Sequence, residues 1–418
     1  MCSRKVSLGS AVILAVAVAA LTMATPAVAQ LKILHNFGAA GFAAGGNYPL
    51  GGLIFDNAGN LYGTTQGGGT YNGGTVYEFT PNGSGGGTEK VLYNFNINAK
   101  DGYGPEAGLV FDGAGNLYGT TNVGGTHGVG TVYELSPNSD GSWTEEILHN
   151  FSGADGGYPT ACVILDAAGN LYGTASQGGG YNAGVVFELK HGAGGVWGYK
   201  VLYNFSGTQG TDGAYPIGGL IWDAAGNLYG TTQDGGTYNG GRGTVFELHP
   251  RGGGSWGESI QHNFGNGQDG EYPQTSLMFD SAGNLYGTTY EGGARLNGTV
   301  FKMTPTGGGS WSETVLYNFN DSSLDEGVFV SSGVMMDSAG NLYGETAQGS
   351  GSTYYGSVFE LTPGAGGAWT ETQLGTFFKQ TLGNGPQGGL VFDSAGNLYG
   401  TTQFGGPGGG GTLFEVTP

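Results

Sequence analysis

The chain repeats one phrase seven times. The phrase A-G-N-L-Y-G, preceded by Asp and one variable residue, begins at Ala58, Ala114, Ala168, Ala225, Ala282, Ala339 and Ala395. Successive copies are 54 to 57 residues apart, and seven such units fill the 389 residues from Gln30 to Pro418. A period this long, carried by short apolar runs between glycine-rich turns, is typical of a β-propeller rather than a short-repeat solenoid. The repeat leaves no room for a second domain.

Each unit contains four strand-like runs, which in the first unit are 51–56 (GGLIFD), 61–66 (LYGTTQ), 74–81 (GTVYEFTP) and 90–95 (KVLYNF). The first run is apolar at consecutive positions, as expected for an inner strand that neighbouring blades cover on both faces. Small residues that suit a crowded axis stand at its start: Gly52, Gly108, Cys162, Gly219, Ser276, Gly333 and Gly389. We expect Cys162 to be a small buried residue rather than a reactive thiol.

The two ends of the chain complement one another. Residues 31–37 (LKILHNF) copy the fourth run of a unit, whereas residues 411–418 (GTLFEVTP) form a third run with no fourth after it. A closed ring needs its first strand to complete its last blade, and closure also removes exposed sheet edges. We therefore predict an all-β fold, a seven-bladed β-propeller with four antiparallel strands per blade, closed by the N-terminal strand.

The segment D-x-A-G-N has two possible interpretations. As the turn between the first and second strands, it uses Asp to accept backbone N–H bonds and Gly to supply a positive φ. As a calcium loop it fails, because one carboxylate and one amide fall short of the roughly six to eight oxygen ligands that Ca²⁺ takes. We interpret the segment as part of the fold, and we expect the Tyr of L-Y-G to pack in the core or between blades.

Residues 1–29 have the pattern of a secretory signal peptide. Arg4 and Lys5 precede an apolar run, and Ala27-Val28-Ala29 supplies the small residues of a cleavage site. The run is too short for a transmembrane helix. We expect residues 30–418 to form a single secreted or periplasmic domain, outside the membrane once the signal is cleaved. Only Cys162 remains in this domain, so a large core rather than disulfides must hold it.

The chain is acidic, with 12 basic and 32 acidic residues and a net charge of −20. Cleavage of the signal would remove Arg4 and Lys5, leaving ten basic residues and a net charge of −22. This charge argues against nucleic acid and anionic membranes as partners. Much of it is periodic, since seven Asp open the repeated phrase and six Glu recur in the V-F-E-L-type runs. Net charge alone therefore does not indicate an acidic binding surface.

The recurring pattern YNF…DGxYPxxGLxxDxxGNLYGTTxxGGxxNGGTVFELTP resembles the GloVer tandem repeat family of exported bacterial proteins, over essentially all of the chain after residue 29. The resemblance implies a repeated architecture and no established activity. Members are often similar in carrying C-terminal sorting anchors, whereas this chain ends at Pro418 directly after a strand, so we expect no anchor. The strand order is also similar to that of NHL and gluconolactonase-like propellers.

A propeller presents its loops around a central channel, and we expect ligands where the loops that enter the inner strand meet those that join the second and third strands. The entering loops carry D-G-x-Y-P segments with Tyr158, Tyr215 and Tyr272. Because these segments recur, we favour a role in loop architecture. The alternative is a ring of Tyr and Asp that binds sugars by stacking and hydrogen bonding.

A specific site is expected where the repeats differ. The departures in these loops are Glu106 and His127 in the second unit, Asp234 and Arg242 in the fourth, and Glu291 and Arg295 in the fifth. Guanidinium groups recognise carboxylates bidentately, so Arg242 and Arg295 point to an acidic sugar or another carboxylate-bearing ligand. The alternative, which we favour, is that Asp234–Arg242 and Glu291–Arg295 are surface ion pairs worth under about 1 kcal/mol each.

Two functions remain open. The first is an exported, non-catalytic propeller, expected to be a monomer, that binds a glycan or a protein at the loop-rich face. The second is a polysaccharide hydrolase or lyase with carboxylates drawn from Glu106, Asp234, Asp269 and Glu291. No catalytic or metal-binding motif appears, so we predict no catalytic residue, no metal site and no cofactor. In gluconolactonase-like enzymes several carboxylates and amides hold a metal, and only Glu106 stands at the corresponding position.

Overall fold

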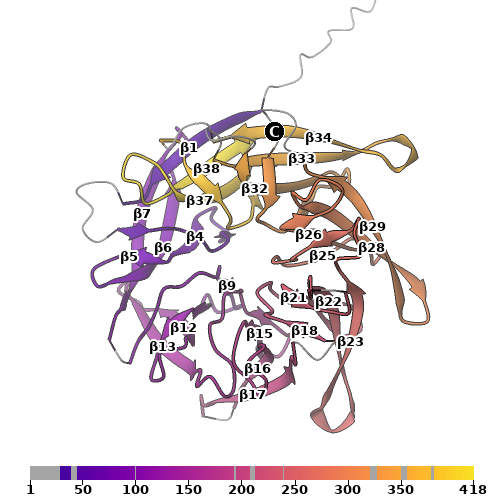
Figure 1. Ribbon diagram of the computed structural model, residues 1–418. Coiled ribbons are helices and arrows are strands. Elements are labelled where there is room, and N and C mark those ends of the chain that lie inside the picture. Colours follow the sequence, from indigo (N-terminus) through magenta and orange to yellow (C-terminus); the bar gives the residue numbers. More distant parts are fainter. Residues whose placement is uncertain are drawn as a thin grey trace, which may run out of the picture.

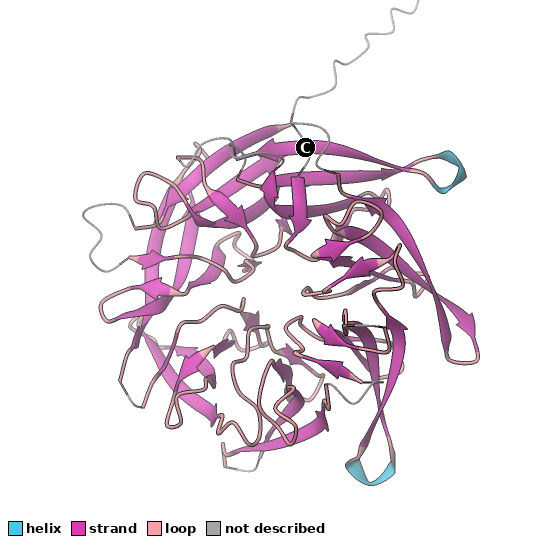
Figure 2. Cartoon of the chain, in the orientation of Figure 1, coloured by secondary structure: helices cyan, strands magenta, loops and turns pink. Residues whose placement is uncertain are grey.

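Seven antiparallel sheets of four or five strands form the blades, and they stand around a common axis (Figure 1). The elements in Figure 2 are strands apart from two short 3-10 helices. The computed structural model describes residues 29–38, 45–98, 100–192, 194–207, 212–238, 240–320, 327–349, 355–377 and 381–418. Residues 1–28 of the predicted signal peptide lie outside this part of the chain. The prediction of a seven-bladed β-propeller with four strands per blade is confirmed.

The first three blades follow the chain from the inner to the outer strand. Blade 1 contains β3 (Ile54–Phe55), β4 (Leu61–Thr65), β6 (Asn72–Pro81) and β7 (Gly87–Asn96). Blade 2 contains β9 (Val110–Phe111), β10 (Leu117–Thr121), β12 (Thr131–Pro137) and β13 (Trp143–Asn150). Blade 3 contains β14 (Ile164–Leu165), β15 (Leu171–Ala175), β16 (Val185–His191) and β17 (Trp197–Asn204).

The remaining blades repeat this order. Blade 4 contains β19 (Ile221–Trp222), β20 (Leu228–Thr232), β22 (Thr244–Pro250) and β23 (Trp256–Asn263), with the 3-10 helix η1 (Gly252–Gly254) in its outer turn. Blade 5 contains β25 (Met278–Phe279), β26 (Leu285–Thr289), β28 (Thr299–Gly307) and β29 (Ser310–Asn318). Blade 6 contains β31 (Met335–Met336), β32 (Leu342–Gly349), β33 (Ser357–Pro363) and β34 (Trp369–Thr376), with η2 (Ala365–Gly367).

The seventh blade joins the two ends of the chain. It contains β36 (Val391–Phe392), β37 (Leu398–Phe404), β38 (Thr412–Thr417) and, as its outer strand, β1 (Gln30–Asn36). β1 pairs antiparallel with β38, and the pairing runs from Gln30 opposite Thr417 to Asn36 opposite Thr412. In Figure 1 the indigo β1 lies beside the yellow β38. The predicted closure by the N-terminal strand is confirmed.

The inner strands are shorter than the sequence predicts. Only Ile54 and Phe55 of the first run pair with β4, because the residues before them face the next blade. A Cβ added to Gly51 would lie 2.4 Å from the carbonyl oxygen of Ala107, and the Thr64 hydroxyl donates a hydrogen bond of 2.8 Å to that same oxygen. A Cβ added to Gly52 would likewise lie 2.7 Å from the carbonyl oxygen of Gly388, whereas one added to Gly389 would meet nothing within 4 Å. Crowding therefore accounts for small residues at the start of some inner strands, but not at Gly389.

The core lies between neighbouring blades. A buried Phe at the end of each outer strand packs against an aromatic residue on the third strand of the next blade, with ring centroids 5.0 to 5.3 Å apart in all seven interfaces. Phe95 lies within β7, and the other six follow their strand by one residue. The pairs are Phe37–Tyr77, Phe95–Tyr133, Phe151–Phe187, Phe205–Phe246, Phe264–Phe301, Phe319–Phe359 and Phe377–Phe414. Each aromatic side chain buries a large apolar area, so these pairs hold the ring of blades together.

The segment D-x-A-G-N forms the predicted turn. Asp56 Oδ1 accepts the backbone N–H groups of Ala58 and Asn60 at 2.8 Å each, and Gly59 has a φ of 87°. Burial alone would raise the pKa of Asp56, but hydrogen bonds from Asn60, Ala58 and Tyr62 outweigh it and hold the pKa below its ordinary value. The ring of Tyr62 packs edge-on against Phe111 of the next blade, 5.0 Å away. Both structural interpretations are confirmed.

Candidate functional site

The loops divide between two faces of the ring. On one face, the segment that enters the inner strand pairs with the start of the loop between the second and third strands. The paired segments are β2 (Gly46–Asn47) with β5 (Gly67–Gly68), β8 (Gly102–Tyr103) with β11 (Val123–Gly124), β18 (Gly213–Ala214) with β21 (Asp234–Gly235), β24 (Gly270–Glu271) with β27 (Glu291–Gly292), β30 (Gly327–Val330) with β32, and β35 (Asn384–Pro386) with β37. We call this the channel-mouth face.

Exposed hydrophobic side chains gather on the channel-mouth face. Nine large hydrophobic residues are exposed in the described part of the chain: Tyr48, Tyr71, Ile97, Tyr181, Val196, Tyr215, Tyr238, Leu296 and Phe404. Seven of them lie in loops of the channel-mouth face, and Phe404 ends β37 on that face. Val196 lies in a turn between the third and fourth strands on the opposite face. Exposed apolar side chains that gather on one face mark interaction surfaces, so this distribution favours the channel-mouth face as the place where a ligand binds.

Five aromatic residues at equivalent positions of this face have left-handed backbone. The φ values are 62° at Tyr48, 55° at Tyr158, 56° at Tyr215, 58° at Tyr272 and 61° at Phe329. The two other blades have Gly104 and Gly385 at this position, each with a φ of 65°. A non-glycine residue in this region costs roughly 1–2 kcal/mol, so glycine would be the relaxed choice in every blade. Strained backbone of this kind is concentrated at functional positions.

The Asp residues of the D-G-x-Y-P segments hold these loops in place. Asp212 Oδ2 accepts hydrogen bonds from the backbone of Ser206 at 2.8 Å and from the Tyr203 hydroxyl at 3.2 Å. Asp269 is buried, and its Oδ1 accepts the N–H group of Gly265 at 3.0 Å. The favoured interpretation of these Asp residues as loop architecture is thereby supported. Asp269 points into its own loop, which removes it from the carboxylates available to a ligand.

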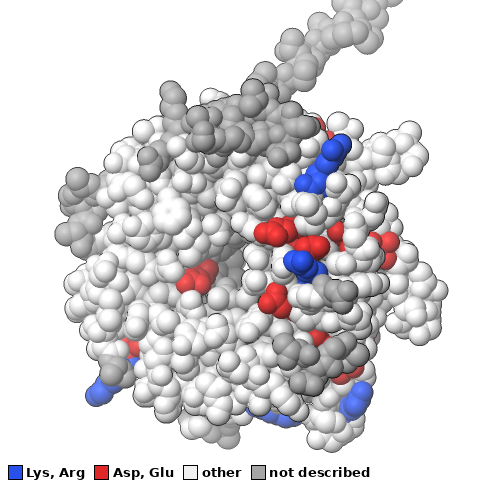
Figure 3. Space-filling view, viewed as in Figure 1, with Lys and Arg blue, Asp and Glu red and all other residues white. Residues whose placement is uncertain are grey.

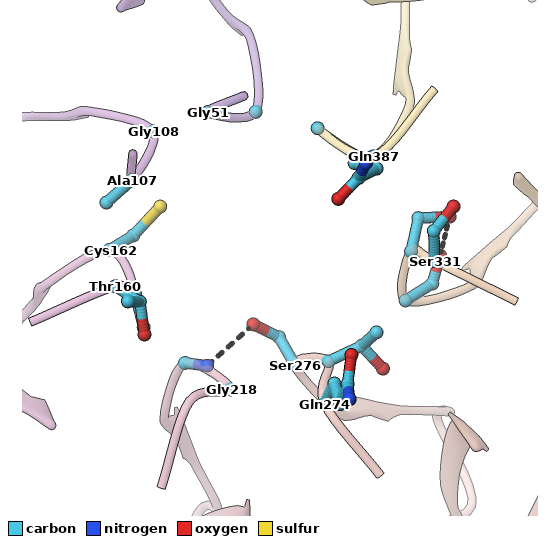
Figure 4. A pocket seen from close by; sticks show the side chains of 18 of the residues that line it. Gly51, Ala107, Gly108, Thr160, Cys162, Gly218, Gln274, Ser276, Ser331 and Gln387 are labelled. Carbon is cyan, nitrogen blue, oxygen red and sulfur yellow. Dashed lines mark hydrogen bonds between the residues drawn. The ribbon is translucent and has the colours of Figure 1, made fainter. Parts of the chain in front are cut away.

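A cavity of about 280 Å³ lies where the inner strands begin, and all seven blades line it. Figure 4 shows Thr160, Cys162, Ser276 and Gln387 around it on blades 3, 5 and 7, with the Ser276 hydroxyl accepting a hydrogen bond from the N–H group of Gly219. Its outermost ring, which we call the rim, consists of Leu50, Glu106, Thr160, Ile217, Gln274, Ser331 and Gln387. Cys162 is partly buried at the cavity wall rather than fully buried as predicted. Burial of its thiol raises the pKa, which agrees with an unreactive residue.

Two other clefts, of about 470 and 620 Å³, lie on the opposite face. They separate neighbouring D-x-A-G-N turns, between blades 7 and 1 and between blades 5 and 6. Their acidic side chains are the turn residues Asp56, Asp280, Asp337 and Asp393, each of which already accepts hydrogen bonds within its own turn. We therefore interpret these clefts as gaps between neighbouring turns and not as ligand sites.

Glu106 is the one charged side chain among the described residues that line the central cavity. Its Oε1 accepts hydrogen bonds from Gln66 Nε2 of blade 1 at 2.7 Å and from Asn122 Nδ2 of blade 2 at 2.8 Å. Neutral amide donors from two blades thus fix the carboxylate without neutralising it. The sequence marked Glu106 as a departure from the repeat, and the structure places it at the rim.

Away from Glu106, acidic and basic side chains gather together on one side of the mouth, as Figure 3 shows. Arg242 Nη1 lies 3.2 Å from Glu271 Oε2, and the guanidinium also contacts the hydroxyl of Tyr272. Glu271 stands directly across the β24–β27 ribbon from Glu291. Burial raises the pKa of Asp234, and the charge of Arg242 opposes this shift.

The predicted ion pairs are wrong. Arg242 pairs with Glu271 of the next blade rather than with Asp234, and among the described residues neither Glu291 nor Arg295 has an oppositely charged group within 4.0 Å. The reason is that the ribbon of blade 5 carries Glu271 where the ribbon of blade 4 carries Ala214. Because Glu271 neutralises Arg242, the acidic-ligand hypothesis loses its main cation.

His127 is not brought to the cavity. It lies exposed in the loop between the second and third strands of blade 2 and makes no hydrogen bond or ion pair with the described residues. The described part of the chain also holds no group of three or more His, Cys, Asp or Glu residues able to bind a metal ion. Within that part, no helix is of the length and apolarity that a membrane crossing requires.

Sequence reasoning missed Glu345, which replaces the fourth residue of L-Y-G-T in blade 6. In the other six blades that Thr donates its hydroxyl to a backbone carbonyl of the next blade. Glu345 is fully buried, and its Oε2 accepts the N–H group of Gly389 at 2.9 Å, while Oε1 has no partner among the described residues. Burial raises its pKa to about 8, despite the bond from Gly389.

A family model, the Gloeobacter/Verrucomicrobia repeat, matches the chain over residues 19–242, 142–325 and 219–418. The chain belongs to this repeat family. The overlapping matches cover nearly the whole chain, so the family shares the tandem repeat that forms the blades. A search of curated proteins finds no match for this member of the family.

Solved structures are similar to this repeat-family protein at low sequence identity. A protein of unknown function from Dyadobacter fermentans is 11% identical with a TM-score of 0.46, over 93% of this chain and 98% of that one. An ancestral GH74 enzyme is 11% identical with a TM-score of 0.56, over 89% of this chain. The match spans 48% of the enzyme chain, and at this identity it shows the propeller fold alone.

Proposed function

We propose that the chain is an exported, non-catalytic carbohydrate-binding propeller whose ligand lies on the channel-mouth face. One observation carries the proposal: five aromatic side chains stand at equivalent positions around the mouth on strained left-handed backbone, where two blades use glycine. Retaining Tyr or Phe at such a position costs stability. Binding of a ligand by these aromatic side chains accounts for their retention despite that cost. The predicted signal peptide of residues 1–29 supplies the route of export.

The chemistry of these side chains suits sugars. A tyrosine ring offers an apolar face to the C–H groups of a pyranose and a hydroxyl to its polar groups. Tyr48 and Tyr215 are each 37% exposed, so their rings are accessible from solvent. Because each backbone is fixed by the hairpin that it enters, for example by the bond from Gln66 N to Tyr48 O at 3.0 Å, little conformational entropy is lost on binding.

A second candidate function rests on the carboxylates of blades 4 and 5. Glu271 and Glu291 are cross-strand partners, and residues so placed have Cβ atoms about 4.5–5.5 Å apart. Paired carboxyl groups at short separation are what a retaining glycosidase uses. We rank this polysaccharide hydrolase or lyase second, because Glu271 already forms an ion pair with Arg242 and is therefore not a free carboxylate. Release of reducing ends from polysaccharides that stops on Glu291→Gln would establish it, and no release would eliminate it.

A glycan array probed with the purified chain from Gln30 tests the primary proposal. The chain is expected to bind a limited set of glycans, and free ligand should compete with that binding. A matched variant, Val196→Ser, changes the exposed residue of the opposite face and should leave the array pattern unchanged. Absence of any bound glycan at high protein concentration would contradict the proposal.

A further inference from the structure

The central cavity has an uneven distribution of charge. Among its described lining residues, Glu106 carries the one formal charge, and no Lys, Arg or His lines it. Around the mouth stand three further acidic residues, Asp234, Glu271 and Glu291, against two basic residues, Arg242 and Arg295. Both the cavity and its surroundings are therefore negative on balance, and such a field attracts a cation.

Glu106 is preorganised to receive a partner. Gln66 and Asn122 both donate to Oε1, whereas Oε2 accepts no hydrogen bond from the described residues. Among the described residues, Asn122 Oδ1 is buried without a partner, so the bond from Asn122 Nδ2 to Glu106 is the hydrogen bond that orients this amide. A carboxylate fixed at the edge of a cavity with one unused oxygen is a ready acceptor for a charged donor.

The rim around Glu106 suits one sugar ring. Polar side chains of Thr160, Gln274, Ser331 and Gln387 stand at four positions of the rim, and apolar side chains stand at Leu50 and Ile217. The hydroxyls of Thr160 and Ser331 donate to carbonyl oxygens of the next blade, so they offer a sugar hydroxyl their acceptor lone pairs. A volume of about 280 Å³ is close to the lower end of small-molecule sites, roughly 300–1,000 Å³, and so fits a single residue of a glycan rather than several. The aromatic residues stand two positions before the rim in the chain, where neighbouring sugars would stack.

We propose that the cavity takes the ammonium group of a non-acetylated hexosamine, with Glu106 as its counter-ion. The inference rests on the proposed carbohydrate-binding function and names its ligand class. The ammonium donates to Oε2 of Glu106, and the ring hydroxyls bond to the polar side chains of the rim. No Lys, Arg or His lines the cavity to receive an acidic sugar, and an N-acetylated or neutral sugar would leave the carboxylate without an opposite charge.

The test is titration calorimetry of the purified chain from Gln30 with three oligosaccharides of equal length, made of glucosamine, N-acetylglucosamine or glucose. At pH 6 and low salt, the glucosamine oligomer should bind roughly ten- to a hundred-fold more tightly than the other two, as expected for a charge-assisted hydrogen bond. Added NaCl should reduce this preference, because screening weakens the ion pair.

Two variants that each remove one negative charge show whether Glu106 itself is responsible for the preference. Glu106→Gln introduces the residue that blades 5 and 7 already have at the rim, Gln274 and Gln387, so the fold should tolerate it. It should bring glucosamine binding down to the level of glucose. Glu146→Gln removes the same charge from an exposed site on the outer strand of the same blade and should leave binding unchanged.

The outcomes separate the two proposals. If the three oligomers bind equally well and Glu106→Gln has no effect, the ammonium site is overturned while the carbohydrate-binding function stands. If glucosamine binding falls equally in Glu106→Gln and Glu146→Gln, general charge rather than Glu106 is responsible, and the inference is again overturned. If none of the three binds and the array also shows no glycan, both proposals fail.

Discussion

The ring of Phe37 lies 5.1 Å from the ring of Tyr77, and this contact joins the closing strand of blade 7 to blade 1. Phe37 is 1% exposed, and it follows β1 directly. The same aromatic contact recurs at the six other interfaces, so the interface between blades 7 and 1 is built like every other interface between blades.

Truncation of Phe37 tests the strength of that junction. Phe37→Ala should lower the free energy of unfolding by about 3–5 kcal/mol, because it removes a fully buried aromatic ring and leaves a cavity. Urea unfolding followed by tryptophan fluorescence measures the change. Val196→Ala, at a residue that is 70% exposed, serves as the control and should change stability by under about 0.5 kcal/mol. Equal effects of the two variants would contradict a closed, well-packed ring.

The turn residue Asp56 predicts a loss of stability that depends on pH. Asp56→Ala removes the acceptor of bonds from Ala58, Asn60 and Tyr62 and should cost about 1–2 kcal/mol at pH 7. The pKa of Asp56 lies below its ordinary value of 3.8, so its stabilising contribution is present above pH 3.8 and is lost as the pH falls through the lower folded value. The difference between variant and wild type should shrink at pH 3, and a difference that grows would contradict the assignment.

Glu345 predicts the opposite dependence on pH. Its folded pKa of about 8 lies above the ordinary value of 4.5, so the folded state favours the protonated form. The contribution is present in full below pH 4.5 and is lost as the pH rises to about 8, by an amount on the order of a few kcal/mol. Glu345→Thr restores the residue of the other six blades, and its melting temperature should exceed that of wild type increasingly between pH 5 and 8.

Glu345→Gln controls for the loss of the carboxyl group without a change of size. It should show the same flatter dependence on pH as Glu345→Thr, because neither variant ionises. A melting-temperature difference from wild type that stays constant over pH 5 to 8 in both variants would show that Glu345 does not titrate in this range.

The fold could be predicted from the sequence because each blade repeats the same short motifs, and each motif specifies its local structure. The Asp and Gly of D-x-A-G-N specify a turn without help from distant residues, and the matching of residues 31–37 to a fourth strand fixes the closure. The partner of Arg242 was not predictable in this way. It depends on Glu271, which comes from the next blade, and only the closed ring brings the two together.

The left-handed backbone at the channel mouth also escaped prediction, although a signal was present. Tyr48, Tyr158, Tyr215 and Tyr272 align with Gly104 and Gly385 in the repeat. A position shared by Tyr and Gly is unusual on grounds of size and is explained by a shared positive φ. Glu345 likewise stood out as the single departure from L-Y-G-T, but its burial follows from how blades 6 and 7 pack.

Replacement of the strained tyrosines by glycine should separate stability from binding. Tyr48→Gly, Tyr158→Gly and Tyr215→Gly introduce the residue that blades 2 and 7 already use with the same φ. Relief of roughly 1–2 kcal/mol of backbone strain at each site offsets the lost packing and the greater freedom of the unfolded chain. Each single variant should therefore stay within about 1 kcal/mol of wild-type stability in urea unfolding. A loss above about 2 kcal/mol would show that the rings serve the fold.

The most direct test of carbohydrate binding at the channel mouth is titration calorimetry of the Tyr48→Gly/Tyr158→Gly/Tyr215→Gly variant with the glycan that the wild-type chain binds best. Stacking on an aromatic ring is worth about 0.5–1.5 kcal/mol, so loss of three rings should weaken binding at least tenfold while the melting temperature stays close to that of wild type. Wild-type affinity in this folded variant would contradict the account.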